Sequence, residues 1–121
     1  MTLFQLGDFV LHSGVSSNFK IDCDALSDED WECLAALVAK NVSFSRVVGI
    51  PEGGLRFAAA LATHACDAAQ RLLIVDDVLT TGASMEAMRL ACGSPRDVTG
   101  VVVFSRGQCP SWVRAIFTLL L

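Results

Sequence analysis

One stretch of the sequence decides the fold, and it reads LLIVDDVLTTGAS at residues 72–84. Its first four residues are apolar, which predicts a short strand buried on both faces. Two carboxylates follow, Asp76 and Asp77, and then a loop that contains hydroxyl side chains and a glycine. A helix is expected from residue 83 to residue 92, where a glycine and a proline stop it. The order strand, loop, helix indicates one unit of an α/β sheet.

Neighbouring segments repeat this order. Residues 47–50 form an apolar strand, and a Pro-Glu-Gly-Gly loop leads from it into an apolar helix from Leu55 to about Cys66. Residues 101–104 supply the next strand, and the apolar residues 115–121 are interpreted as a closing strand. Strands that are buried on both faces and alternate with helices are typical of parallel sheets. We therefore predict an α/β fold, a mostly parallel twisted sheet flanked by helices with a Rossmann-like core.

A further helix precedes the first of these strands. Ser27 is placed to cap its start, and Asp30 stands at the third helical position. The helix is expected to end near residues 40–41. Four apolar residues at spacings i, i+3, i+4 and i+7 predict its buried face: Trp31, Leu34, Ala35 and Val38.

Composition limits the class of protein. The 121 residues suit one domain over residues 1–121, and 53% apolar residues with a mean hydropathy of +0.52 exclude disorder. No apolar run is long enough to span a membrane and no secretory signal is visible, so a cytoplasmic location is expected. The net charge of -4 argues against a nucleic-acid partner. The five cysteines include no C-x-x-C pair, which predicts reduced packing residues and neither zinc nor disulfides.

The end of the 72–75 strand is the predicted functional site, because ligands of open α/β sheets bind at the carboxyl ends of strands. Asp76 and Asp77 are expected in a solvated cleft, where they accept hydrogen bonds from sugar hydroxyls. Backbone amides of residues 80–84 can converge on a phosphate group. Two alternatives remain: an ordinary surface turn before a helix, or an acid pair that binds Mg²⁺ as in receiver-like domains.

In nine residues this pattern resembles the PRPP-binding motif of the type I phosphoribosyltransferases. The resemblance implies that Asp76 and Asp77 are the catalytic pair and contact the ribose 2- and 3-hydroxyls. It also implies that the loop holds the 5-phosphate of PRPP. The residues that match this loop are Thr80, Thr81, Gly82, Ala83 and Ser84.

Residues 9–14, followed by Ser17, Phe19 and Asp22, resemble the N-terminal stretch of orotate phosphoribosyltransferases. The resemblance implies that Phe19 lies close to the nucleobase. It places His12, also as a base-binding residue, where that family commonly carries a lysine, although a histidine is no fixed cation.

Two more segments match the same family. Arg106 stands where these enzymes place an arginine that grips the carboxylate of the base; the alternative is an exposed arginine that closes a strand. The other segment corresponds to the pyrophosphate loop, whose glycines let backbone amides approach the leaving group. Its glutamate is unfavourable beside an anion unless Mg²⁺ bridges them or the side chain points away. The loop consists of Pro51, Glu52, Gly53 and Gly54.

The chain departs from the family at the mobile loop that closes over the active site and carries a lysine. Here only residues 62–70 join the helix to the 72–75 strand, and residues 67–70 contain no lysine or arginine. Arg56 or a partner subunit is a candidate to supply the missing charge. Away from the site, Trp112 and Phe117 are predicted to pack in the core, and His64 to be partly buried inside its helix.

The expected function is therefore that of an orotate-type phosphoribosyltransferase. Such an enzyme transfers the phosphoribosyl group of PRPP to a nucleobase and releases pyrophosphate. The resemblance implies a homodimer, and Mg²⁺ that is held through substrate and water rather than by direct protein ligands. The alternative is a non-catalytic module that senses PRPP or a nucleotide monophosphate. A third possibility, an RNA-binding regulator, is disfavoured by the acidic charge.

Overall fold

The computed structural model describes residues 1–119. Its strands and helices, in chain order, are β1 (Phe4–Val10), β2 (Ser16–Ile21), the 3-10 helix η1 (Cys23–Ala25), α1 (Asp28–Asn41), β3 (Arg46–Gly49), α2 (Leu55–Ala62), the 3-10 helix η2 (Asp67–Ala69), β4 (Leu72–Leu79), α3 (Ala83–Ala91), β5 (Val98–Ser105) and β6 (Val113–Thr118).

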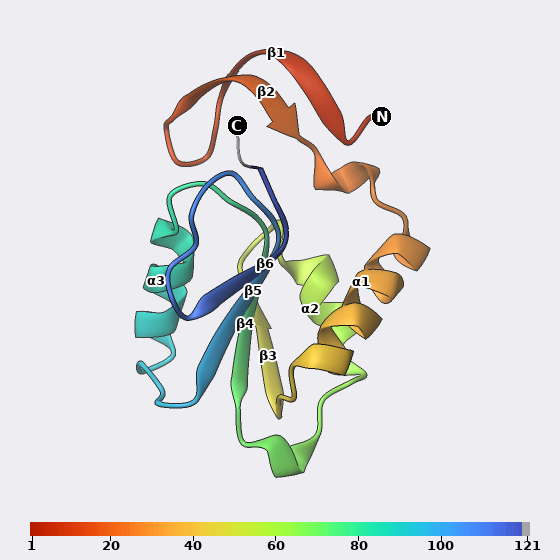
Figure 1. Cartoon of the computed structure of the whole chain (residues 1–121), viewed down its shortest axis with the longest axis vertical. Helices are drawn as coiled ribbons and strands as arrows, with labels where there is room; N and C mark the ends of the chain where they lie inside the picture. Colours follow the sequence, from red (N-terminus) through yellow and green to blue (C-terminus); the bar gives the residue numbers. More distant parts are fainter. Residues whose placement is uncertain (120–121) are drawn as a thin grey trace.

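The central sheet has four strands in the order β3-β4-β5-β6, and every neighbouring pair is parallel. Figure 1 shows α3 on one face of this sheet and α1 with α2 on the other. The predicted α/β fold with a parallel sheet is confirmed. Because all four strands run the same way, their carboxyl ends meet at one edge of the sheet, where the predicted site residues lie.

Alternate residues of β4 build the two halves of the core. Leu73 and Val75 pack in the cluster that includes residues of α1 and α2, whereas Leu72 and Ile74 pack with Met85 of α3. Successive strand residues point to opposite faces, so a strand covered on both faces needs a continuous apolar run. This requirement is the physical reason that the LLIV run gave a reliable strand prediction.

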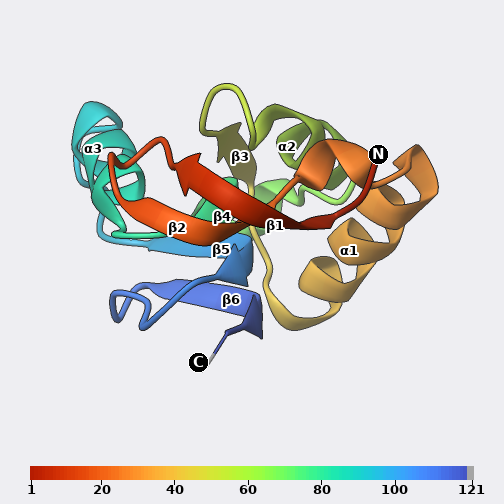
Figure 2. The same cartoon turned by 90° about the horizontal axis from the view of Figure 1, so that it is seen from above.

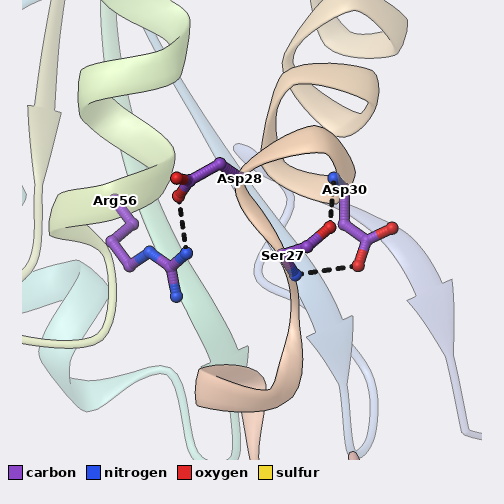
Figure 3. Close-up of polar contacts among 4 residues, drawn as sticks. All are labelled: Ser27, Asp28, Asp30 and Arg56. Carbon is purple, nitrogen blue, oxygen red and sulfur yellow. Dashed lines mark hydrogen bonds and ion pairs between the residues drawn. The ribbon is translucent and has the colours of Figure 1, made fainter.

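Helix α1 begins as predicted. The Ser27 Oγ accepts a hydrogen bond from the Asp30 N–H at 3.1 Å, and the Asp30 carboxylate accepts one from the Ser27 N–H at 2.9 Å (Figure 3). This reciprocal pair is a capping box, which satisfies amides that the helix itself leaves without partners. All four residues of the predicted apolar face are buried, so this face is confirmed.

An antiparallel hairpin of β1 and β2 precedes α1, and its register shifts between Leu6 and Phe9. Figures 1 and 2 show the hairpin lying across the sheet at the edge where the parallel strands end. The Phe4 ring meets Phe104 of β5 edge-on, with ring centroids 5.8 Å apart. Sequence reasoning did not predict these two strands.

The helix predicted from Leu55 to about Cys66 is shorter than expected and ends at Ala62. The chain turns away there because the His64 N–H donates to the Leu61 carbonyl, and the Cys66 N–H then donates to the Phe44 carbonyl. His64 therefore lies beyond the helix and is exposed, so its predicted packing position was wrong.

The C-terminal strand also differs from the prediction. Strand β6 begins at Val113 and ends at Thr118, whereas residues 120–121 of the predicted strand lie outside the described residues. Trp112 packs against the α3 side of the core, as predicted. Phe117 was expected in the core but is 51% exposed, because β6 is an edge strand and this ring lies on Phe104 with centroids 5.4 Å apart.

All five cysteines are free thiols. Cys23 is buried, but Cys33 and Cys66 are exposed, so the prediction that all five pack in the interior was wrong. Within residues 1–119, every helix is too short or too polar to cross a membrane.

Candidate active site

The two carboxylates lie inside β4 rather than after it. Pairing with β5 continues past them, from Asp76 opposite Val102 to Leu79 opposite Ser105. The Asp77 N–H donates to the Asp76 Oδ1 at 2.8 Å, and the Val78 N–H donates to the Asp77 Oδ1 at 2.7 Å. The predicted strand boundary was therefore wrong by four residues, because apolar character ends at residue 75 whereas backbone pairing continues to residue 79.

Asp76 is less solvated than the predicted cleft required. Burial, together with the hydrogen bond and the negative charge of Asp77, raises the pKa of Asp76 from 3.8 to about 8. Desolvation disfavours an ionised carboxyl group, and a second carboxylate beside it does the same. Burial and the neighbouring carboxylate therefore favour the protonated form of Asp76 relative to an exposed aspartate.

This arrangement makes the stability of the protein depend on pH. Because folded Asp76 holds its proton more tightly than the unfolded chain does, the contribution of Asp76 to stability is fully present below about pH 4 and is lost as the pH rises toward 8. Asp76→Asn cannot ionise, so we expect it to raise the free energy of unfolding at pH 8 by about 2 kcal/mol, an amount reduced by partial solvent exposure. Denaturant unfolding at pH 4, 6 and 8 measures this difference, which should vanish near pH 4.

The matched control is Asp67→Asn, an exposed carboxylate in η2. This control should follow the wild-type pH profile. A constant difference between Asp76→Asn and wild type across the three pH values would contradict the assignment of the proton to Asp76.

The loop of residues 51–54 lies directly on β4. The Ile50 N–H donates to the Val75 carbonyl at 2.9 Å, and the Gly54 N–H donates back to the Ile50 carbonyl at 2.8 Å. A Cβ atom on Gly53 would stand 2.6 Å from the Asp77 Cγ, closer than real side chains approach. The predicted pyrophosphate loop and the predicted ribose acids are thus brought together, and Glu52 is exposed.

The loop after β4 leads into the start of α3. Gly82 has φ +86°, a left-handed conformation that glycine adopts without steric cost. The Ala83 N–H donates to the Thr81 Oγ1 at 3.3 Å, and no side chain caps Gly82. The positive end of the α3 dipole and its first-turn amides are therefore at the carboxyl end of β4, where an anion is stabilised.

Arg106 directly follows β5 and reaches the N-terminal hairpin. Its Nη1 donates to the Phe19 carbonyl at 3.3 Å, its Nη2 donates to the Ser17 Oγ, and its Cζ lies 3.7 Å from the centroid of the Phe19 ring. Two of the three predicted base-binding residues are thus together. His12 is exposed in the hairpin turn, and no hydrogen bond within residues 1–119 joins it to either of them.

Sequence reasoning assigned no role to Ser17, which is the residue that joins the hairpin to Arg106. The signal in the sequence was its spacing from Phe19. In a strand, residues two apart point to the same face, so a hydroxyl group at residue 17 must accompany the aromatic ring at residue 19.

Arg56 does not face the pyrophosphate loop with a free guanidinium group. Its Nη2 lies 2.8 Å from the Asp28 Oδ1 (Figure 3). Its Cζ lies 5.8 Å from the centroid of the Trp31 ring. The side chain therefore joins α2 to α1. The connection from α2 to β4 is short, as predicted, and contains only η2 between residues 63 and 71.

The residues fit a magnesium ion that is shared with a substrate. No group of three or more potential ligands occurs in the described part of the chain. Mg²⁺ commonly keeps several waters and binds one or two carboxylates together with substrate phosphates. Asp76 and Asp77 lie beside the glycine loop, where their oxygens could accept hydrogen bonds from the waters of an ion that the substrate holds.

No protein-family profile matches the chain. Among curated proteins, the orotate phosphoribosyltransferase of Pyrobaculum aerophilum is 32% identical over 136 aligned positions, which cover 87% of this chain and 70% of that protein. The chain belongs to the orotate phosphoribosyltransferase family. The orotate phosphoribosyltransferase of Sulfurisphaera tokodaii is 29% identical over 69% of this chain, which spans only 56% of that relative.

The solved structure of orotate phosphoribosyltransferase from Aeropyrum pernix has the same fold. It superposes with a TM-score of 0.72 and 26% identity over 96% of this chain and 88% of that one. Inside the aligned region, this chain has fewer residues than the Pyrobaculum protein. Because 87% of 121 residues is about 105, about 30 of the positions aligned with the Pyrobaculum protein have no counterpart here. Within this aligned region the chain is therefore shorter than the Pyrobaculum protein.

Proposed function

We propose that the chain is an orotate-type phosphoribosyltransferase that transfers the phosphoribosyl group of PRPP to an acidic nucleobase and releases pyrophosphate. The observation that carries this proposal is the contact between Gly53 and the Asp77 carboxylate. It joins a glycine loop suited to an anion with an acid pair suited to sugar hydroxyls. The start of α3 adds a second anion-binding element beside them.

In this proposal each element holds one part of PRPP. Asp76 and Asp77 accept hydrogen bonds from the ribose 2- and 3-hydroxyls, and the amides of residues 80–84 hold the 5-phosphate. The amides of residues 51–54 meet the departing pyrophosphate. Magnesium bound with the substrate neutralises part of the pyrophosphate charge. Arg106 pairs with the carboxylate of the base, because a guanidinium group can donate two parallel hydrogen bonds to a carboxylate.

A direct assay tests the activity. Protein incubated with PRPP, Mg²⁺ and orotate should form the nucleotide and pyrophosphate in equal amounts. Chromatography measures the nucleotide, and a pyrophosphate assay measures the second product. Uracil, which lacks the carboxylate, should react far more slowly. If PRPP binds but neither product forms from any base, the transferase proposal is wrong.

PRPP binding without product formation would support the alternative, a module that binds PRPP without turnover. Two observations favour it: the short connection between α2 and β4, and the pairing of Arg56 with Asp28. An enzyme that lacks a positioned cation beside the leaving pyrophosphate is expected to lose about 10²–10³ in rate. Calorimetry of PRPP binding, combined with the absence of products, identifies the sensor.

We also propose that the chain acts as a homodimer in the cytoplasm. Support for the dimer comes from an apolar groove of about 480 Å³ between β1, α1 and β6, beside which Phe4 and Phe117 are more than half exposed. Contiguous exposed apolar surface marks interaction sites. Light scattering measures the mass in solution.

Free cysteines are consistent with the proposed cytoplasmic location, because the cytoplasm is a reducing compartment.

A further inference from the structure

Ser17 connects the N-terminal hairpin to the end of β5 through a saturated set of hydrogen bonds. Its Oγ donates to the Phe19 carbonyl at 2.7 Å and accepts from the Phe19 N–H at 3.2 Å. It also accepts from the Arg106 Nη2. A serine hydroxyl has one hydrogen and two acceptor positions, so all three are used. The direction of this hydroxyl is therefore fixed by the backbone of β2, and a lone pair faces Arg106.

Arg106 depends on this hydroxyl for its orientation. Its other two hydrogen bonds go to the Phe19 carbonyl and are long, at 3.3 Å from Nη1 and 3.4 Å from Nη2, whereas N–H···O bonds in proteins usually measure about 2.9–3.0 Å. The stack on the Phe19 ring fixes the plane of the guanidinium group but not its rotation within that plane. The Ser17 hydroxyl fixes the rotation.

The oriented Arg106 guanidinium group still has N–H donors that a ligand could use. Its five N–H groups exceed the three hydrogen bonds found within residues 1–119, and none of these bonds uses the Nε–H. Burial lowers the pKa of Arg106, yet an arginine in a protein keeps its charge. The group is thus a partly buried, oriented cation with unused donors at the carboxyl edge of the sheet.

We propose that Ser17 is a positioning residue for base recognition: its hydroxyl holds the Arg106 guanidinium group in the orientation that binds the carboxylate of an acidic base. The inference rests on the proposed transferase function and adds a specificity determinant to it. Ser17 acts through Arg106 and does not itself touch the base. Two segments 89 residues apart thereby form one recognition element.

The test compares Ser17→Ala with Ser17→Thr, which keeps the hydroxyl and suits a strand position. We expect Ser17→Ala to raise the KM for orotate about tenfold, the effect of one lost charge-assisted hydrogen bond. The Kd for PRPP and the low rate with uracil should change less than twofold. Ser17→Thr should restore most of the orotate KM. A general loss of folding would instead affect all three measurements.

A second arm establishes that the effect passes through Arg106. In an Arg106→Ala background, orotate use should already be weak, and adding Ser17→Ala should lower it no further. An additional tenfold loss in that background would show that Ser17 acts independently and would overturn the proposal. An unchanged or lower orotate KM in Ser17→Ala would overturn it as well, because the hydroxyl would then be a competitor for Arg106 rather than its support.

The outcomes separate this inference from the function on which it rests. If the wild-type protein neither binds PRPP nor uses orotate, the transferase proposal fails and the role of Ser17 fails with it. If the wild-type protein is active and Ser17→Ala has the same orotate KM, only the role of Ser17 is wrong.

Discussion

Replacing both Asp76 and Asp77 by asparagine should weaken PRPP binding more than 100-fold. The two carboxyl groups are the acceptors proposed for the ribose hydroxyls. A hydrogen bond to a neutral acceptor contributes about 0.5–1.5 kcal/mol, and one to a charged acceptor contributes about 1.5–3 kcal/mol. Asparagine keeps the size of the side chain and an oxygen for the backbone N–H groups of residues 77 and 78. Calorimetric titration with PRPP in the presence of Mg²⁺ measures the loss.

The double variant should remain folded, which makes the result interpretable. Replacing the ionisable carboxyl group of Asp76 by an amide is expected to leave the chain as stable or more stable at neutral pH, so lower binding would accompany equal or higher stability. Asp67→Asn serves as the control, because this exposed carboxylate lies in η2, before β4. If the double variant bound PRPP within twofold of wild type, the site would lie elsewhere.

The second large effect is expected from Gly53→Ala. The new methyl group would stand 2.6 Å from the Asp77 Cγ, so either the loop moves off β4 or the carboxylate rotates out of its position. Either movement separates the amides proposed for pyrophosphate from the acids proposed for ribose. We expect a loss of about 10²–10³ in kcat/KM for PRPP, the range found when one preorganised donor is lost.

Stability provides the control for this variant. Overpacking at one position costs about 1–3 kcal/mol, which should leave the fold intact. Gly107→Ala adds the same methyl group where a Cβ has open space, so its free energy of unfolding should match that of wild type. Wild-type kcat/KM in Gly53→Ala would contradict the close approach of the loop to Asp77.

Local signals in the sequence were sufficient for most of the sheet and for α1. Two short patterns predicted their elements from a few residues each: the capping pair of Ser27 and Asp30 for α1, and the LLIV run for β4. The hairpin of β1 and β2 could not be predicted in this way. The burial pattern of β1 is irregular and the pairing has one register shift, whereas β2 alternates regularly but has only two apolar residues, Phe19 and Ile21.

The candidate site was predictable in its residues but not in its contacts. The acid pair lies in the second half of β4 and the glycine loop follows β3, the neighbouring strand of the same parallel sheet, so topology places both near the same edge. The pairing of Arg56 with Asp28, and of Arg106 with Ser17, depends on how separate segments pack together. Periodicity within a segment carries no information about either pair.

The contact between Arg106 and the hairpin also determines when the site is completed during synthesis. The Phe19 carbonyl and the Arg106 guanidinium group are 87 residues apart. At a translation rate of about 5–20 residues per second, Arg106 follows Phe19 by roughly 4–17 seconds. The hairpin leaves the ribosome before β3, β4 and β5, yet the arginine that it contacts follows β5. In a nascent chain this contact therefore forms only after three strands of the sheet have been made.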